Sequence, residues 1–178
     1  MEKKMIQVYV QELTTYNNAI GVGRWIDVDN FDAELKDLLN EATNVLKEEG
    51  YYYGVECEEW EIVDYECEVD IDLKNIYQDI DTLKELNDLL LELNDTEIKV
   101  VGFLLDEEFS LDQIDKDKIE EVRVFESWDD AIDEFIEFYL CIDDGSSIHS
   151  YLDYSKIQRD LEIEGYCENN NGEIFYYH

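Results

Sequence analysis

The chain has 178 residues, of which 48 are Asp or Glu and 13 are Lys or Arg, and its formal net charge is −35. Hydrophobic residues make up 45% of it and aromatic residues 13%, which is enough for a folded core and excludes a disordered acidic tail. The surplus of acids runs through the whole chain, since residues 1–72, 73–118 and 119–178 carry net charges of −14, −8 and −13. The folded body itself is therefore the polyanion.

Hydrophobic periodicity predicts the elements of the first part of the chain. Residues 5–11 (MIQVYVQ) and 24–28 (RWIDV) are predicted strands. The polar, Gly- and Asn-rich residues 12–23 between them are a predicted loop. Apolar residues at helical spacing then predict a helix over residues 31–49, capped by Asp29 or Asn30 and ended by Gly50.

Residues 56–73 (ECEEWEIVDYECEVDIDL) are the most acidic stretch and contain no Lys or Arg. From Asp64 to Leu73, acids and apolar residues alternate strictly, which predicts a half-buried strand. The best-supported part of this strand is residues 60–66, and the alternation would extend it to residue 73. The solvent-exposed face of such a strand would hold a carboxylate every ~6.7 Å, which is twice the rise per residue. Such a row of like charges is either an ordinary solvated face or a binding surface.

The remaining elements follow from the same patterns. Residues 74–118 read as wholly helical, with helices starting at Asp81 or Thr82, over 96–108 and, shorter, over 110–118. The last part is predicted to hold a strand over 122–125, a helix with Ser127 as its N-cap and Asp130 at its third position, a loop over 143–147, a helix over 153–163 ending before Gly165, and a hairpin of 166–168 and 173–177 around an Asn-Gly turn.

These elements predict an α+β fold with antiparallel sheets in three small modules. The N-terminal α+β module covers residues 1–73, a helical middle module 74–118, and a C-terminal α+β module 119–178. A sphere of this length would have a radius of gyration of ~16 Å and would suffer strong self-repulsion. Duplex DNA spreads the same number of charges over about 60 Å. We therefore expect an elongated arrangement of the modules.

The sequence holds no pattern typical of a catalytic, metal or cofactor site. Four cysteines form no C-x-x-C pair, and His149 and His178 lie at no ligand spacing, so we expect reduced cysteines in a cytoplasmic protein without zinc. No EF-hand loop, G-x-S-x-G motif or complete glycine-rich phosphate loop occurs. Neither a signal peptide nor a membrane span is expected. We predict no cofactor, no enzymatic activity and, because the bases are scattered, no direct nucleic-acid binding.

Several blocks of the sequence resemble ArdA-type antirestriction proteins. The block IQVYVQELTTYNNAIGVGRWIDV is similar to the opening of that family, and EEWEIVDYE to its acidic strand. The block DTLKELNDLLLEL is similar to a helix of the family, and SYLDYSKIQRDLEIEG to its pattern near the C-terminus. The matching positions are Leu13, Tyr16, Asn17, Gly23, Trp25, Ile26, Ile62, Asp64, Tyr65, Glu66, Leu83, Leu86, Asn87, Leu89, Tyr151, Asp153, Tyr154, Arg159, Asp160 and Leu161. The chain departs from the pattern over residues 96–118 and matches it loosely over 137–149.

The resemblance implies a DNA mimic: an elongated, dimeric protein of three modules, carried by mobile elements and phages. It would evade host defence by occupying the DNA-binding groove of type I restriction–modification enzymes. The composition by itself indicates only the class, a folded polyanion that competes for a basic groove. Carboxylates could replace phosphates there, because neutralised phosphates supply most of the sequence-independent affinity of DNA-binding proteins.

The expected mimic positions are carboxylates of the acidic strand and of the C-terminal module, although any one of them could also be an ordinary solubilising charge. They are Asp64, Glu66, Glu68, Asp70, Asp133, Glu137, Asp143, Asp144 and Asp153. Five aromatic residues are instead expected in the core: Tyr9, Trp25, Trp60, Trp128 and Phe135. If a homodimer forms, an apolar patch in the C-terminal module is the expected contact, and its residues are Ile148, Tyr151, Leu152 and Tyr154.

Two other functions remain open on sequence grounds. An acidic adaptor or chaperone for a basic protein would share the electrostatics without the groove geometry. An enzyme would need a catalytic constellation, which the motifs do not contain. Competition with duplex DNA for a type I enzyme distinguishes the mimic, binding to basic peptides without such competition indicates the adaptor, and turnover of a substrate would indicate the enzyme.

Overall fold

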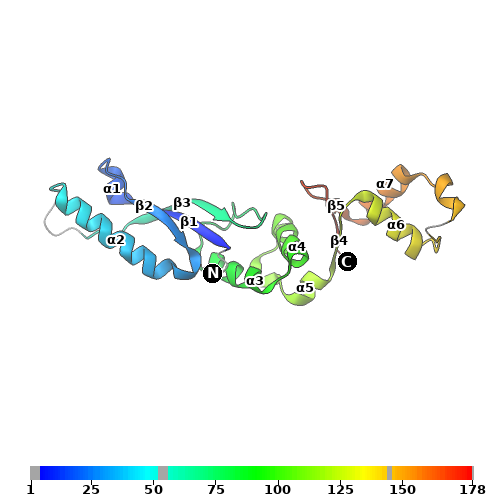
Figure 1. The fold of residues 1–178 in the computed structure, drawn as a ribbon, viewed down its shortest axis with the longest axis horizontal. Helices are drawn as coiled ribbons and strands as arrows, with labels where there is room; N and C mark the ends of the chain where they lie inside the picture. The colour runs from blue at the N-terminus through cyan, green and yellow to red at the C-terminus, as the bar shows by residue number, and fades with distance from the viewer. Residues whose placement is uncertain (1–4, 52–55, 144–145, 178) are drawn as a thin grey trace. The chain divides into compact units, whose positions relative to one another are not determined.

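The computed structural model describes residues 5–51, 56–143 and 146–177. The chain divides into two compact units, Met1–Asn94 and Asp95–His178 (Figure 1). In the part of the chain that the structure describes, no helix combines the length and the hydropathy that a membrane span requires.

The first unit is built on a three-stranded antiparallel sheet. Strands β1 (Ile6–Glu12), β2 (Gly23–Asp27) and β3 (Trp60–Cys67) lie in the order β2-β1-β3. After a 3-10 turn, η1 (Val28–Asn30), helix α2 (Phe31–Glu48) packs against one face of the sheet. Val8 and Val10 of β1, with Leu38 of α2, are fully buried in this layer. The predicted strands and the predicted helix are confirmed to within one or two residues.

The segment between β1 and β2 contains a short helix, α1 (Leu13–Asn17), where a loop was expected. The side chain of Glu12 is buried and accepts hydrogen bonds from the backbone N–H groups of Thr14 (2.9 Å) and Thr15 (2.6 Å). A capping carboxylate satisfies N–H groups that a helix start otherwise leaves unpaired. Sequence patterns missed this helix because a five-residue helix shows almost no periodicity.

Strand β3 ends earlier than the alternation in its sequence. Its ladder with β1 runs to the pair Ile6–Cys67, and the last backbone bond is from the N–H of Glu68 to the carbonyl of Met5 (2.8 Å). Beyond it the chain bends, yet Ile71 and Leu73 are still buried. The expected extension of the strand to residue 73 is therefore wrong: the alternation reflects which side chains are buried, not a continued strand.

Helix α3 (Ile80–Glu92) belongs to the first unit, and Asp79 caps its start. Its buried Asn87 accepts a hydrogen bond from the N–H of Ile6 (3.1 Å) and donates one to Asp29 (2.7 Å). Lys84 forms an ion pair with Asp32 (2.9 Å). These polar contacts fix α3 against the start of β1 and the turn before α2.

The second unit holds a second antiparallel sheet, in the order β4-β6-β5. Its elements, in chain order, are α4 (Asp95–Asp106), η2 (Leu111–Gln113), α5 (Lys116–Glu120), β4 (Val122–Phe125), α6 (Trp128–Phe138), η3 (Ser147–Tyr151), α7 (Tyr154–Glu164), β5 (Tyr166–Glu168) and β6 (Ile174–Tyr177). The strand over 122–125, the Ser127 cap of α6 and the hairpin are confirmed. The single helix expected over 110–118 is wrong, because a 3-10 turn, η2, and a separate short helix, α5, occupy this stretch.

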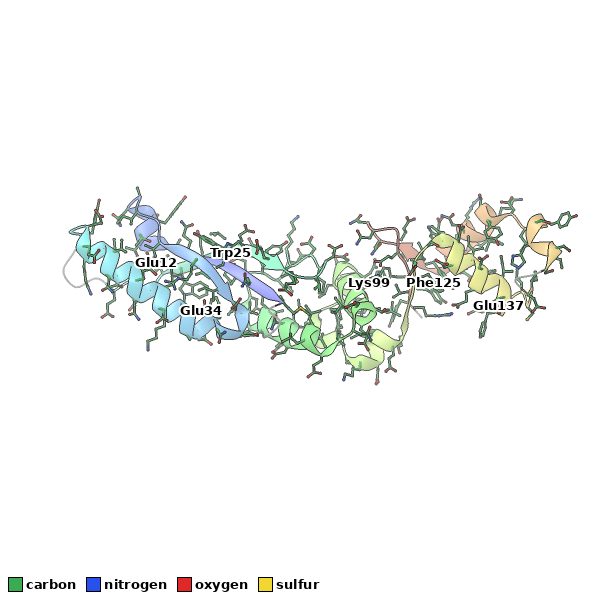
Figure 2. The ribbon with its side chains drawn as sticks, viewed as in Figure 1. Glu12, Trp25, Glu34, Lys99, Phe125 and Glu137 are labelled. Atoms are coloured by element: carbon green, nitrogen blue, oxygen red, sulfur yellow. The ribbon has the colours of Figure 1, made fainter. Side chains whose placement is uncertain are left out.

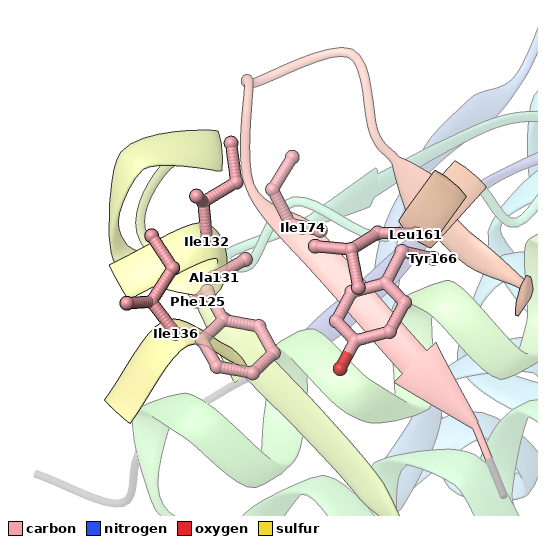
Figure 3. Packing of buried hydrophobic residues seen from close by; sticks show 7 residues of the cluster. All are labelled: Phe125, Ala131, Ile132, Ile136, Leu161, Tyr166 and Ile174. Atoms are coloured by element: carbon pink, nitrogen blue, oxygen red, sulfur yellow. The ribbon is translucent and has the colours of Figure 1, made fainter. Parts of the chain in front are cut away.

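Side chains cover both faces of this second sheet. On one face, Phe125, Ile132, Ile136, Leu161 and Ile174 form a buried cluster with Ala131 and Tyr166, contributed by the sheet, α6 and α7 (Figure 3). On the other face, the ring of Phe103 in α4 stacks on that of Phe175 in β6, with centroids 4.6 Å apart.

The expected α+β class with antiparallel sheets is confirmed. Within the helical middle of the chain, α3 packs on the first unit, whereas α4 and α5 pack against the second sheet. The division into three modules and the elongated shape stay predictions.

Candidate partner-binding surface

Most carboxylates of the chain have no base of their own. With 48 acids and 13 bases, at least 35 acids lack a separate cationic partner. The pairs that do form are mostly at the surface, such as Arg24 with Glu41 and Arg123 with Glu134. Among the described residues, no group of three or more His, Cys, Asp or Glu side chains is arranged to hold a metal ion. The chemistry available on this surface is therefore chiefly that of exposed anions.

The acidic strand places three exposed carboxylates on the sheet face opposite α2. Register pairs Glu66 with Gln7, Asp64 with Tyr9 and Glu61 with Gln11, and residues paired in this way share a face. Val63 has no partner on β1, because Tyr9 pairs with Asp64 and Val10 with Ile62. This β-bulge reverses the parity of the strand. It brings Glu61 to the same face as Asp64 and Glu66.

Glu61 is a position that the sequence reasoning missed. The strict alternation begins only at Asp64, and extending its parity backwards predicts that Glu61 lies on the buried face. The available signal was the adjacent apolar pair Ile62 and Val63, which interrupts the alternation and is typical of a bulge.

Glu68 and Asp70, expected on the same strand face, are exposed but lie beyond the end of β3. The nearby Asp72 accepts hydrogen bonds from the N–H of Lys74 and the hydroxyl of Tyr65, both at 2.9 Å, and these bonds lower its pKa. The bend therefore carries anions too, but their spacing is not that of a strand.

Trp25 was expected in the core, and it is instead 37% exposed. It lies on β2 (Figure 2). Its register partner on β1 is Tyr9, and the two rings meet edge to face with centroids 5.5 Å apart. Trp60 is half-buried and packs its ring against Phe31, as expected for a core residue. An aromatic pair thus shares the open face with the carboxylates of β3.

In the second unit, α6 and the following segments carry the other predicted acids. Asp133 and Glu137 are exposed on α6, where Figure 2 labels Glu137. With Glu134, Ile142 and His149 they line a hollow of about 350 Å³. Asp133 accepts a hydrogen bond from the hydroxyl of Tyr154 (2.8 Å). Asp143 and Asp153 are exposed, and Asp153 also caps α7, whereas Asp144 lies outside the described residues.

The four residues expected at a dimer contact divide into two kinds. Ile148 and Tyr151 are 50% and 86% exposed. Leu152 and Tyr154 are half-buried and pack against the core of the second unit. Three further apolar side chains at the end of α6 are exposed and were not predicted: Phe138, Tyr139 and Leu140.

Comparison with known proteins gives one result that covers nearly the whole chain. A family model described as "Antirestriction protein (ArdA)" matches residues 8–175. No sequence among the curated proteins matches the chain. The family match spans both units, including the acidic strand and α6.

Proposed function

The chain belongs to the ArdA family of antirestriction proteins, and from that premise we propose that it blocks type I restriction–modification enzymes by occupying their DNA-binding groove. In this proposal the protein is a DNA mimic and acts without catalysis or a cofactor. It acts in the cytoplasm, where it meets its target, and it works as a homodimer. It binds neither DNA nor a membrane.

The mechanism is electrostatic competition. A DNA-binding groove gains affinity when its Lys and Arg side chains neutralise phosphates and release their counterions. Carboxylates on a folded protein can enter the same groove without any base-edge pattern, so inhibition should not depend on the recognition sequence of the enzyme.

The observation that best supports the proposal is the row of Glu61, Asp64 and Glu66 on the open face of the first sheet. Alternate residues of a strand lie ~6.7 Å apart, whereas one DNA strand carries a charge every ~3.4 Å of the helix axis. A single row therefore supplies about half the charge density of one DNA strand. Further exposed acids, including Asp133 and Glu137 on α6, must contribute the rest.

The test is competition with duplex DNA for a purified type I enzyme. The apparent inhibition constant for DNA cleavage should rise in proportion to the concentration of added duplex without a recognition site, and inhibition should weaken steeply with salt. Inhibition that is independent of added duplex would contradict the proposal. Tight binding to basic, histone-like peptides with no effect on the enzyme would indicate an acidic adaptor instead.

A further inference from the structure

The open face of the first sheet combines carboxylates with an aromatic pair, and its described strand positions include no cation. The register places nine positions on this face: Asp27, Gln7, Glu66, Trp25, Tyr9, Asp64, Gly23, Gln11 and Glu61. None of them is Lys or Arg. Arg24, between Gly23 and Trp25, points to the other face and pairs with Glu41 of α2. The described strands therefore supply no positive charge to balance this face.

Gly23 makes room for the aromatic pair. A Cβ atom at this position would lie 2.9 Å from the hydroxyl oxygen of Tyr9 and 3.1 Å from its ring. The Tyr9 side chain therefore extends across β2 beside Trp25, meeting it edge to face. The pair is held by the backbone and by close packing, and more than a third of Trp25 stays exposed.

Protection of an edge strand explains only part of this arrangement. Charged residues on an edge strand such as β3 prevent pairing with another sheet. That reason covers Glu61, Asp64 and Glu66. It does not explain the exposed tryptophan on the opposite edge strand, β2, because an apolar ring does not prevent that edge from pairing with another sheet.

A guanidinium group fits both halves of the surface. It is a planar cation that stacks on aromatic faces and is weakly hydrated, and it binds carboxylates through a fork of donors. An ammonium group is a compact, strongly hydrated charge, for which a carboxylate alone suffices. A polyanion such as DNA is excluded by the charge of the face.

We propose that this face binds arginine side chains of a partner protein in preference to lysine, with Trp25 contacting the guanidinium plane and Asp64 and Glu66 accepting its N–H groups. The inference deepens the proposed function, because it states which cationic groups of a DNA-binding groove this part of the mimic contacts. It concerns the first unit alone.

The test uses the intact protein and two short probes, tetra-arginine and tetra-lysine peptides. Binding is measured from the indole N–H signals in ¹H–¹⁵N spectra. The signal of Trp25 is identified by its loss in Trp25→Phe. Both peptides should shift this signal. The apparent dissociation constant for tetra-arginine should be about three- to fivefold lower than that for tetra-lysine, the range expected for an exposed cation–π contact. The signal of the half-buried Trp60 serves as the internal reference.

Variants separate the two halves of the surface. Trp25→Leu should remove the preference for tetra-arginine over tetra-lysine, measured by calorimetry. Both peptides should still bind weakly through the carboxylates. Trp25→Phe, which keeps a ring, should restore most of the preference. Asp64→Asn should weaken both peptides alike, and Tyr16→Ala, at an aromatic residue of α1 that is 56% exposed, should change neither.

Equal binding of the two peptides by the wild-type protein, or a preference that survives in Trp25→Leu, would overturn the inference. The peptide assay contains no restriction enzyme, so its result does not depend on the proposed target. If the peptides behave as expected and no type I enzyme is inhibited, the proposed function fails and the arginine-binding face stands.

Discussion

Glu12 is a carboxylate that serves the fold rather than a partner. Burial raises its pKa, but the backbone N–H groups of Thr15 and Thr14 and their side chains favour the charged form more strongly, so that the pKa is lowered overall. A lowered pKa in the folded state means that the stability it contributes is present above the unfolded value near 4.5 and is lost as the pH falls through the folded value.

Glu12→Gln should therefore lower the free energy of unfolding by about 1–2 kcal/mol at pH 7, the usual cost of losing a helix cap. The difference from the wild type should shrink as the pH falls below 4.5, the unfolded-state value, towards the lower pKa of Glu12 in the folded protein. Urea unfolding at several pH values measures both effects. Glu61→Gln, the same change of charge at an exposed site, is the control and should cost little.

Single carboxylates at the surface are expected to matter much less than the row they form. Asp64→Asn should change the inhibition constant for a type I enzyme by less than about threefold, since one contact among many contributes a small part of the salt-dependent affinity. Neutralising Glu61, Asp64 and Glu66 together should weaken inhibition by about tenfold or more.

The matched control neutralises three exposed acids of α2 and its end: Asp37, Glu48 and Glu49. Both triple variants have the same net charge. Equal losses of inhibition would show that total charge decides binding and that the position of the row on β3 does not.

At the scale of elements, the bulge in β3 and the end of α6 decide what the surface presents. The bulge at Val63 collects the acids of β3 on one face, as described above. At the other end of the chain, α6 finishes in three exposed apolar residues, close in sequence to η3 with its exposed Ile148 and Tyr151. On a protein of charge −35, we expect two copies to meet at exposed apolar residues such as these, because charged surfaces repel.

Replacing Ile148 and Tyr151 with Asp should give a protein that elutes as a monomer of 21.1 kDa, whereas the wild type should run at twice that mass. The reason is that each copy would have to bury two added charges. Light scattering coupled to gel filtration measures the mass. Leu152 is unsuitable for this test, because it packs on the core and its loss would also affect folding. A wild type that is monomeric at all concentrations would contradict the proposed contact.

At the scale of the whole molecule, the charge opposes folding and favours binding. Salt screens repulsion between exposed charges over a Debye length of ~10 Å at 0.1 M. Raising NaCl from about 0.05 to 0.5 M should therefore increase the melting temperature of the free protein. The same change should weaken inhibition of a type I enzyme by about tenfold or more. Calorimetry and cleavage assays in matched buffers check the two opposite trends.

The elongated shape is a prediction of the same electrostatics. A compact sphere of this length would have a radius of gyration of ~16 Å. We expect a clearly larger value in small-angle scattering at moderate salt, since spreading the charge lowers repulsion. A profile that fits a sphere would count against mimicry of a duplex.

The sequence by itself determined the class of the fold, the positions of most helices and strands, several of their caps and the polyanionic character. These depend on neighbours within a few residues: alternation for a strand, helical spacing for a helix, Ser127 for a cap. Resemblance in ordered blocks also identified the family. Local patterns relate residues that are close along the chain, so they contain no information about contacts between distant segments.

Only the tertiary structure decided which side chains share a surface. The pairing of β1 with β3 created the bulge that places Glu61 with Asp64 and ended the strand before Glu68. Pairing of β1 with β2 set Trp25 beside Tyr9 on an open face, although its apolar character alone suggested burial. The physical reason is that exposure and proximity depend on contacts between segments far apart in sequence, and these contacts form only when the sheet assembles.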